Sequence, residues 1–110
     1  MLPGFKPLKL YKGDTFAFRL TLDTGNSDYN ITGHTFISQI KEKGKSTAVA
    51  SFTYAIENAV QGIVLLTLTA AEASKLIGGK KYEYDVEMNN SGVKSTILYG
   101  PVIVVADVSS

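Results

Sequence analysis

A short stretch in the C-terminal third of the chain constrains its fold most. Residues 80–88 read KKYEYDVEM, in which apolar side chains take every second position and acids lie between them. A repeat of two residues is typical of a β-strand with one apolar and one wet face, whereas a helix would scatter these groups around its circumference. Gly78-Gly79 precedes the stretch and residues 89–92 (NNSG) follow it, and these residue types favour turns. The sequence therefore predicts a strand that leads directly into a hairpin.

Length and composition indicate one domain with an ordinary core. The chain has 110 residues and no cysteine, which excludes a disulfide framework and a thiolate metal site. A domain over residues 1–110 buries roughly two-thirds of the surface that its unfolded chain exposes. No apolar run approaches the ~20 residues of a membrane-spanning helix, so we expect no membrane partner. Residues 1–4 lack the features of a signal peptide, and we expect the mature chain to begin where it is written and to be made in the cytoplasm.

The charge pattern argues against nucleic acid as a partner. The net charge is +1, and Arg19 is the one arginine among eleven basic residues. Duplex-binding domains usually carry a clear basic excess that displaces counterions. The local cluster Lys41-Glu42-Lys43-Gly44-Lys45 is typical of a solvated hairpin tip.

Further alternating stretches predict the other strands. Residues 1–11 contain Pro3 and Pro7, which cannot donate to a central ladder, and so indicate an edge strand or an arm. Residues 15–22 form the clearest amphipathic strand, with apolar side chains on one face. Residues 23–30 are polar and predict a loop. The remaining predicted strands are Gly33 to Lys41, Thr47 to Ile56, Gly62 to Leu68 and Val93 to Val105, the last with a bulge or kink at Gly100-Pro101.

One short helix is expected between the fifth and sixth strands. Residues 69–72 (TAAE) have the form of a capping box, in which the Thr69 hydroxyl accepts from the Glu72 amide and the Glu72 carboxylate reaches back to Thr69. The helix should run from Ala70 to about Leu76, with Leu76 and Ile77 closing the end of the sandwich. Residues 106–110 should fray.

Together these elements predict an all-β fold. About seven short strands with turn signals between them favour an immunoglobulin-like β-sandwich, and a small open barrel is the alternative. Tyr82 lies where such folds often place a tyrosine whose hydroxyl bonds to nearby backbone, although plain core packing would also explain it.

Residues 62–68 are apolar on both faces, which raises the question of what covers the outer one. If Val64, Leu66 and Leu68 face the core, Ile63 and Leu65 face outward. Either the N-terminal arm or a loop packs over this pair, or the pair belongs to a subunit contact, because exposed apolar patches tend to mark interfaces. We therefore take Ile63 and Leu65, with Ile37 and Phe5, as candidate interface residues.

The residues predict no chemical reaction. His34 is the only histidine, and no nucleophile or carboxylate is placed beside it by any motif. Phosphate-binding, dinucleotide-binding and nucleophile-elbow motifs do not occur. Glu83, Asp85 and Glu87 could offer oxygen ligands to calcium, but a pleat spaces them along a face, which favours a solvated surface balanced by Lys or Arg19 on neighbouring strands. We expect no catalytic residue, no metal, no cofactor and no enzymatic activity.

Several motifs resemble, in order and spacing, a group of small bacteriophage proteins. The motifs are Gly13-Asp14-Thr15-Phe16, Asn30-Ile31-Thr32-Gly33-His34-Thr35, Gln39-Ile40-Lys41, Gly62 with its apolar strand, Leu68-Thr69-Ala70-Ala71-Glu72, Gly79 and Tyr82-Glu83-Tyr84-Asp85-Val86. The resemblance covers roughly Lys12 to Val105. The group is similar to the immunoglobulin-like N-terminal domain of phage upper-baseplate proteins, and stand-alone members are encoded among phage structural genes.

This resemblance implies a non-enzymatic virion structural protein, made in the host cytoplasm. The written chain ends soon after its last predicted strand, without the long continuation of baseplate members, and so we expect an adaptor or decoration at the tail, neck or baseplate, or a cement protein on the capsid. Its partners would be other virion proteins, and the chain would be a homo-oligomer or a multi-copy part. The alternative is a free-standing module that binds a carbohydrate or host protein through residues 23–30 and 89–93, as loops on rigid sandwiches often do.

Overall fold

The computed structural model describes residues 4–22 and 29–105, and these residues are mostly β-strand. The predicted loop at 23–30 falls almost wholly outside the described residues, as does the frayed tail at 106–110. The elements are β1 (Gly4–Phe5), β2 (Leu8–Tyr11), β3 (Phe16–Thr21), β4 (Thr35–Glu42), β5 (Ala48–Asn58), β6 (Ile63–Leu68), α1 (Ala70–Ala73), β7 (Lys81–Asn90) and β8 (Val93–Val105).

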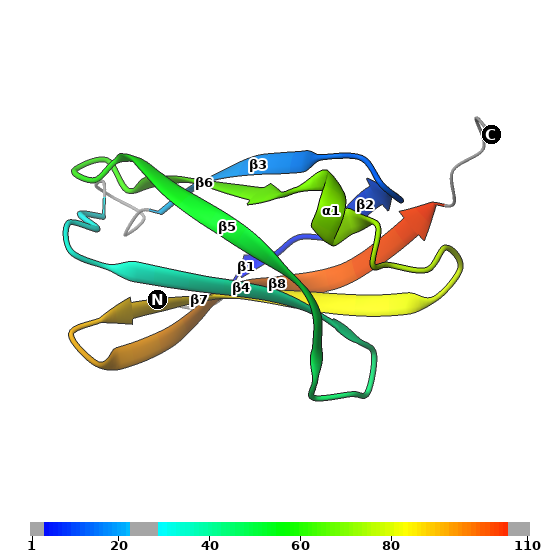
Figure 1. Cartoon of the computed structure of the whole chain (residues 1–110). Coiled ribbons are helices and arrows are strands. Elements are labelled where there is room, and N and C mark those ends of the chain that lie inside the picture. The colour runs from blue at the N-terminus through cyan, green and yellow to red at the C-terminus, as the bar shows by residue number, and fades with distance from the viewer. Residues whose placement is uncertain (1–3, 23–28, 106–110) are drawn as a thin grey trace.

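The strands form one sheet that curls into a half-barrel. Their order is β1-β8-β7-β4-β5-β6-β3, and β2 pairs with β8 beside β1. The long strand β5 pairs with β4 through residues 48–52 and with β6 through residues 53–58. It therefore crosses from the layer of β4, β7 and β8 to the layer of β6 and β3 (Figure 1). The all-β prediction is confirmed, and the described strands number eight because the N-terminal segment forms two short ones.

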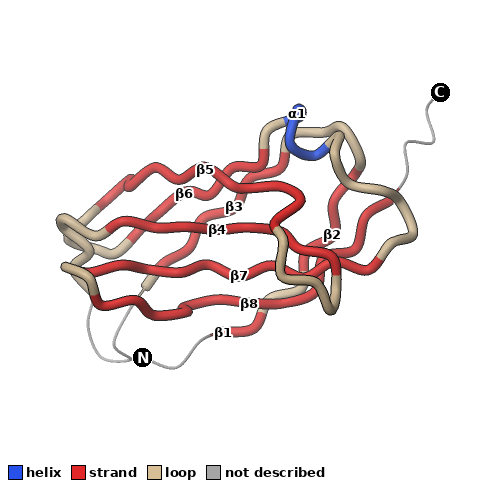
Figure 2. Tube along the Cα trace, turned by 60° about the horizontal axis from the view of Figure 1, so that its bottom comes forward, coloured by secondary structure: helices blue, strands red, loops and turns tan. Residues whose placement is uncertain are grey.

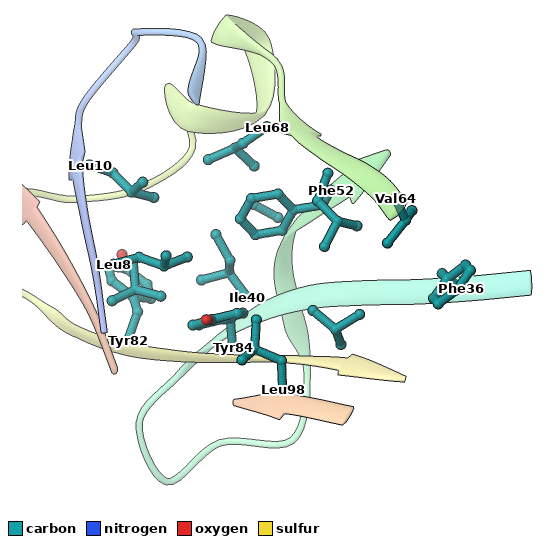
Figure 3. Packing of buried hydrophobic residues seen from close by; sticks show 14 of the residues in the cluster. Leu8, Leu10, Phe36, Ile40, Phe52, Val64, Leu68, Tyr82, Tyr84 and Leu98 are labelled. Atoms are coloured by element: carbon teal, nitrogen blue, oxygen red, sulfur yellow. The ribbon is translucent and has the colours of Figure 1, made fainter. Parts of the chain in front are cut away.

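The core lies between these two layers and follows the predicted alternation. The alternation in residues 80–88 correctly predicts the buried side chains of β7, which are Tyr82, Tyr84, Val86 and Met88. In Figure 3, side chains from β5 and β6 face those from β4, β7 and β8, with Phe52, Val64 and Leu68 opposite Ile40, Tyr84 and Leu98. Each such apolar side chain contributes about 1.5–3 kcal/mol when fully buried.

Strand β3 differs from the other core strands because it lies at the end of the sheet. Phe16, Phe18 and Leu20 point toward the core but are only half-buried. Phe18 still packs edge-on against Phe52, with ring centroids 5.8 Å apart. These side chains remain partly exposed because, among the described strands, β3 has a neighbour, β6, on one side only.

The N-terminal arm, β1 and β2, runs parallel to β8 and covers its outer edge, as the two prolines predicted. Figure 2 shows β4, β7, β8 and β1 following one another across this layer. Where the arm passes β8, the Lys6 amide donates to the Tyr99 carbonyl at 2.9 Å. The Lys6 carbonyl accepts from the Tyr84 hydroxyl at 2.8 Å. The arm is thus fastened to both β8 and the core.

The prediction of a bulge or kink at Gly100-Pro101 is wrong in its position, because β8 continues unbroken and in register through these residues. The irregularity lies at Ile97, an extra residue between the pairs Val86–Leu98 and Glu87–Thr96. Gly100 has a different role. A Cβ atom there would lie 2.3 Å from the Lys6 carbonyl oxygen, so only glycine lets the arm approach β8 this closely.

We expect Gly100→Ala to destabilise the fold by about 1–3 kcal/mol, because the added methyl must displace the backbone of the arm. The free energy of unfolding in urea measures this loss. Gly4→Ala is the matched control, since its Cβ would lie 3.3 Å from the end of the Leu98 side chain and no closer than 3.8 Å to any backbone atom. Equal losses in the two variants would contradict the proposed role of Gly100.

The buried hydroxyl of Tyr84 makes stability depend on alkaline pH. Burial raises the pKa of Tyr84 from 10.0 to about 12. The folded state therefore holds this proton more tightly than the unfolded state, and the resulting stability is complete below pH 10 and lost as pH rises from 10 to about 12. In urea unfolding across this range, Tyr84→Phe should show a shallower decline than the wild type. An identical decline would rule out Tyr84 as its source.

The helical segment is shorter than predicted, and its cap is half of a capping box. The Thr69 hydroxyl accepts from the Glu72 amide at 3.2 Å, as expected. The Glu72 carboxylate does not return to Thr69. It accepts from the Ser51 amide at 2.8 Å and pairs with Lys75, which ties α1 to β5. The helix ends at Ala73.

The segment after α1 closes one end of the core with a single side chain. Leu76 is completely buried, but Ile77 is 50% exposed, so the prediction that both residues close the end is wrong for Ile77. The Ile77 amide instead donates to the Tyr82 hydroxyl at 3.0 Å. Tyr82 is thus both a buried core residue and a partner of nearby backbone, and the two interpretations of it hold together.

Candidate docking site on the outer sheet face

A row of side chains crosses the outer face of the larger layer. Strand register places Phe5 beside Tyr99, Tyr99 beside Asp85, and Asp85 beside Gln39. The row therefore spans β1, β8, β7 and β4. Gln39, Asp85 and Tyr99 share a face because each is one position out of phase with buried neighbours, for example Tyr84 and Val86 on either side of Asp85. Phe5 joins this face through its pairing with Tyr99.

A second row lies next to the first and has a different character. Pro101 pairs with Glu83, and Glu83 pairs with Lys41. Beyond Lys41, the tip of the β4–β5 hairpin carries Lys43 and Lys45. The Lys45 amide donates to the Glu42 carbonyl at 2.9 Å, and Gly44 has a φ of 85°, so the predicted hairpin tip is confirmed.

The two rows and the hairpin surround a hollow of about 660 Å³. Its apolar wall is the Phe5–Tyr99 pair, whose rings meet edge to face with centroids 5.4 Å apart. Both rings are accessible, since Phe5 is 62% and Tyr99 44% exposed. The opposite wall is formed by the lysines of the hairpin.

The floor of the hollow is polar and partly shielded from water. Burial raises the pKa of Asp85, Lys41 lowers it, and Glu87 and Glu83 raise it further. The backbone at this point is fixed, because the Ser38 hydroxyl donates to the Asp85 carbonyl at 2.8 Å. Lys41 lies opposite Glu83 on the neighbouring strand, which is the placement that a balance of this acidic face by lysine requires.

The described lining residues include neither histidine nor cysteine, and within the described ranges no three acidic or histidine side chains are grouped as metal ligands. The hollow offers aromatic edges, a prolyl ring, amide and carboxylate oxygens and ammonium groups. Such a set is suited to binding by contact, hydrogen bonds and charge.

The four predicted interface residues lie on two different faces. Phe5 lines the hollow, and Ile37 lies on the same outer face of the layer, 52% exposed and opposite Glu87. Ile63 and Leu65 lie on the outer face of β6, in the other layer, and are half-buried. The structure therefore brings Phe5 and Ile37 to one surface and keeps Ile63 and Leu65 apart from it.

An ion pair crosses β6 beside Ile63 and Leu65. Arg19 on β3 donates to Glu57 on β5 through two nitrogens, at 2.5 and 3.4 Å. Since Arg19 lies opposite Leu65 and Glu57 lies beside the partner of Ile63, this bridge spans the middle strand between the two apolar side chains. Of the alternatives for covering this pair, the N-terminal arm is wrong for its described part, which pairs with β8. Cover by a loop and a subunit contact stay predictions. Arg19 balances Glu57 and not the acids of β7.

His34 lies away from the hollow and is buried. Its Nδ1 lies 3.1 Å from the Thr32 carbonyl oxygen, and Tyr29 packs edge-on with ring centroids 6.0 Å apart. Among the described residues, its Nε2 has no hydrogen-bond partner. These contacts of His34 do not include a serine, threonine or cysteine nucleophile positioned to react.

Sequence reasoning did not single out Tyr99, Gln39 or Asp85 as one site. The signal for Tyr99 was present, because a tyrosine out of phase with Leu98 and Gly100 must point away from the core. Its partner Phe5 could not be assigned, since parallel pairing of a two-residue strand with β8 leaves no local pattern.

A comparison with protein-family models finds no match. A comparison with curated proteins finds no similar sequence. Within residues 4–22 and 29–105, no helix has the length and apolar character needed to cross a membrane.

Proposed function

We propose that this chain is a non-enzymatic structural protein of a bacteriophage virion. It acts as an adaptor or decoration at the tail, neck or baseplate, or as a cement on the capsid, in several copies per particle. The observation that carries the proposal is the exposed Phe5–Tyr99 pair beside a hollow on a sheet face. Accessible aromatic side chains in a concave, partly polar setting are typical of protein–protein contact sites.

The resemblance to phage upper-baseplate domains supports this proposal from the sequence. It rests on motifs that the fold uses as turns and strand starts, such as Gly13 after β2 and Gly62 before β6. We further propose that the half-barrel is an immunoglobulin-like variant whose two layers share β5. The bond from the Ile77 amide to the Tyr82 hydroxyl supports this, since immunoglobulin-like folds commonly bond a tyrosine hydroxyl to backbone a few residues upstream.

The direct test is to measure the protein content of purified particles of the phage whose genome encodes the chain. Quantitative mass spectrometry of density-purified particles should detect the chain at a fixed ratio to the major coat protein. Its absence from particles that contain the other structural proteins would overturn the proposal. Its presence at several copies supports a repeated part.

A second function is favoured by one feature of the same hollow. Exposed aromatic rings next to amide and carboxylate groups, here Tyr99 beside Asp85 and Gln39, also suit a saccharide. A glycan array probed with the purified chain tests this function, with Tyr99→Ala as the control. Binding that Tyr99→Ala abolishes would favour the carbohydrate-binding module, and an array without hits would remove it.

A further inference from the structure

The two edges of the sheet differ in whether another strand covers them. At one end, β1 and β2 cover β8, and Pro7 interrupts the arm. At the other end, β3 has no neighbour beyond β6 among the described strands. An open strand edge presents a row of unpaired backbone groups, and proteins usually protect it with proline, lysine, a bulge or a cover.

Strand β3 has none of the usual protections within its own residues. It contains no proline, glycine or lysine, and its pairing with β6 shows no register shift. Its single charge, Arg19, is held by Glu57 over the middle of the layer. The ion pair with Glu57 partly neutralises this charge, so Arg19 discourages pairing less than an unpaired lysine would.

The hydrogen-bond phase identifies which backbone groups are free. The Leu22 amide donates to the Gly62 carbonyl at 2.9 Å, so even-numbered residues of β3 bond to β6 in the antiparallel ladder. Ala17, Arg19 and Thr21 then point their N–H and C=O groups to the open edge. Their side chains are exposed on the outer face, so nothing described covers this edge.

We propose that β3 pairs antiparallel with β3 of a second copy of this chain, in the register that places Ala17 opposite Arg19 of the copy. By symmetry Arg19 then lies opposite the copy's Ala17, and Phe18 lies opposite its own equivalent. The inference goes beyond the proposed virion function and does not depend on it.

The sequence of β3 fits itself in this one register. The hydrogen-bonded pairs must join odd-numbered residues, which alone have free backbone groups. A shift that centres the pair on Arg19 would set two like charges directly opposite each other, which is destabilising. A shift that centres it on Ala17 or on Leu20 would pair only three residues of each β3 strand, residues 16–18 or 19–21, whereas the proposed register pairs five, residues 16–20. A shift by one residue would turn the apolar side chains to the wrong face.

The same register covers the apolar surface that β3 leaves open. Phe18 meets its equivalent in a non-hydrogen-bonded pair, where side chains approach most closely, and Phe16 meets Leu20 of the copy. These three are the half-buried side chains that β3 itself turns toward the core. A second copy is thus the partner whose edge and side chains match β3. Because one short strand pair buries less than a standard interface, the dimer should be weak.

Sedimentation equilibrium of the purified chain over rising concentration tests the proposal. The wild type should form a reversible dimer with a dissociation constant between about 10 μM and 1 mM. Ala17→Pro should abolish it, because the Ala17 amide faces the open edge and its loss leaves the ladder with β6 intact. Circular dichroism confirms that the monomer remains folded.

Charged substitutions at Ala17 test the register. They do not depend on whether Ala17→Pro folds. Ala17→Glu places an acid opposite Arg19 of the copy at two symmetric positions, and should lower the dissociation constant by about two- to thirtyfold. Ala17→Lys should raise it by a similar factor. Thr53→Glu and Thr53→Lys are the matched controls, since Thr53 is exposed on the same face two strands from Ala17 and should not change it.

A chain that stays monomeric up to about 1 mM overturns the proposal. So does a dimer that folded Ala17→Pro leaves unchanged, or one that responds equally to charge at Ala17 and Thr53. A monomeric chain that is nevertheless abundant in particles would sink this inference alone and leave the virion function standing.

Discussion

Gly62→Ala should destabilise the protein by about 3–5 kcal/mol, a large share of the 5–15 kcal/mol that holds a typical domain folded. Two costs combine at this position. Gly62 has a φ of 73°, a left-handed conformation that residues with a Cβ adopt at a cost. A Cβ there would also lie 2.4 Å from the Tyr29 carbonyl oxygen and 2.7 Å from that of Leu22.

The clash has a specific structural consequence. Leu22 and Tyr29 are the described residues on either side of the 23–28 segment, and the Tyr29 amide donates to the Leu22 carbonyl at 3.3 Å. Gly62 lies against both and immediately precedes β6. A side chain at Gly62 therefore pushes on two backbone segments that cannot move without breaking the pairing of β3 with β6.

Gly92→Ala separates the two costs. Gly92 has a φ of 90°, but a Cβ there would meet nothing within 4 Å. We expect this control to lose only about 1 kcal/mol, from backbone conformation. Urea unfolding of both variants measures the difference, and equal losses would show that the close approach at Gly62 does not matter.

Ile40→Ala should cost about 2–5 kcal/mol, the range for an aliphatic side chain removed from a closed core. Ile40 is completely buried at the centre of β4 and lies between the two layers (Figure 3). The surrounding strands are fixed by their ladders on both sides, so the cavity left by the side chain closes only in part.

Ile37→Ala is the control for Ile40→Ala on the same strand. Ile37 is 52% exposed on the outer face, and its truncation should change the free energy of unfolding by less than about 1 kcal/mol. Unfolding in urea, monitored by circular dichroism, compares the two. A larger loss at Ile37 would mean that the faces of β4 are reversed.

Local alternation was enough to predict which side of a strand is buried. The period of two placed Tyr82, Tyr84, Val86 and Met88 inside correctly, because side chains two apart must share a face. The capping threonine was also visible, since Thr69 and Glu72 lie within one turn. These features depend on neighbours close in the chain.

Features that depend on distant segments were missed. The curl of the sheet follows from β5 changing partners near Phe52, and nothing local in β5 marks this change. The bulge at Ile97 depends on register with β7. Gly100 and Pro101 suggested a kink. Glycine is needed at this position because the backbone of Lys6, distant in the sequence, packs directly against it.

The candidate site was predicted only in part for the same reason. Phe5 was named as an interface residue, but its partner Tyr99 and the polar row beside it come together through pairing of four strands. The ion pair between Arg19 and Glu57 joins residues 38 positions apart. Pair contacts of this kind have no signature in a single sequence.

Incorporation of outer-face variants into phage particles tests the central claim most directly. Tyr99→Asp should fold normally, since its ring is 44% exposed, and its copy number in purified particles should fall at least about tenfold, because truncating an aromatic anchor commonly costs 2 kcal/mol or more. Val60→Asp changes a residue that is 65% exposed in the turn between β5 and β6 and does not line the hollow, and this variant should be incorporated at the wild-type level. Normal incorporation of folded Tyr99→Asp, or equal loss of both variants, would contradict a docking role for the Phe5–Tyr99 face.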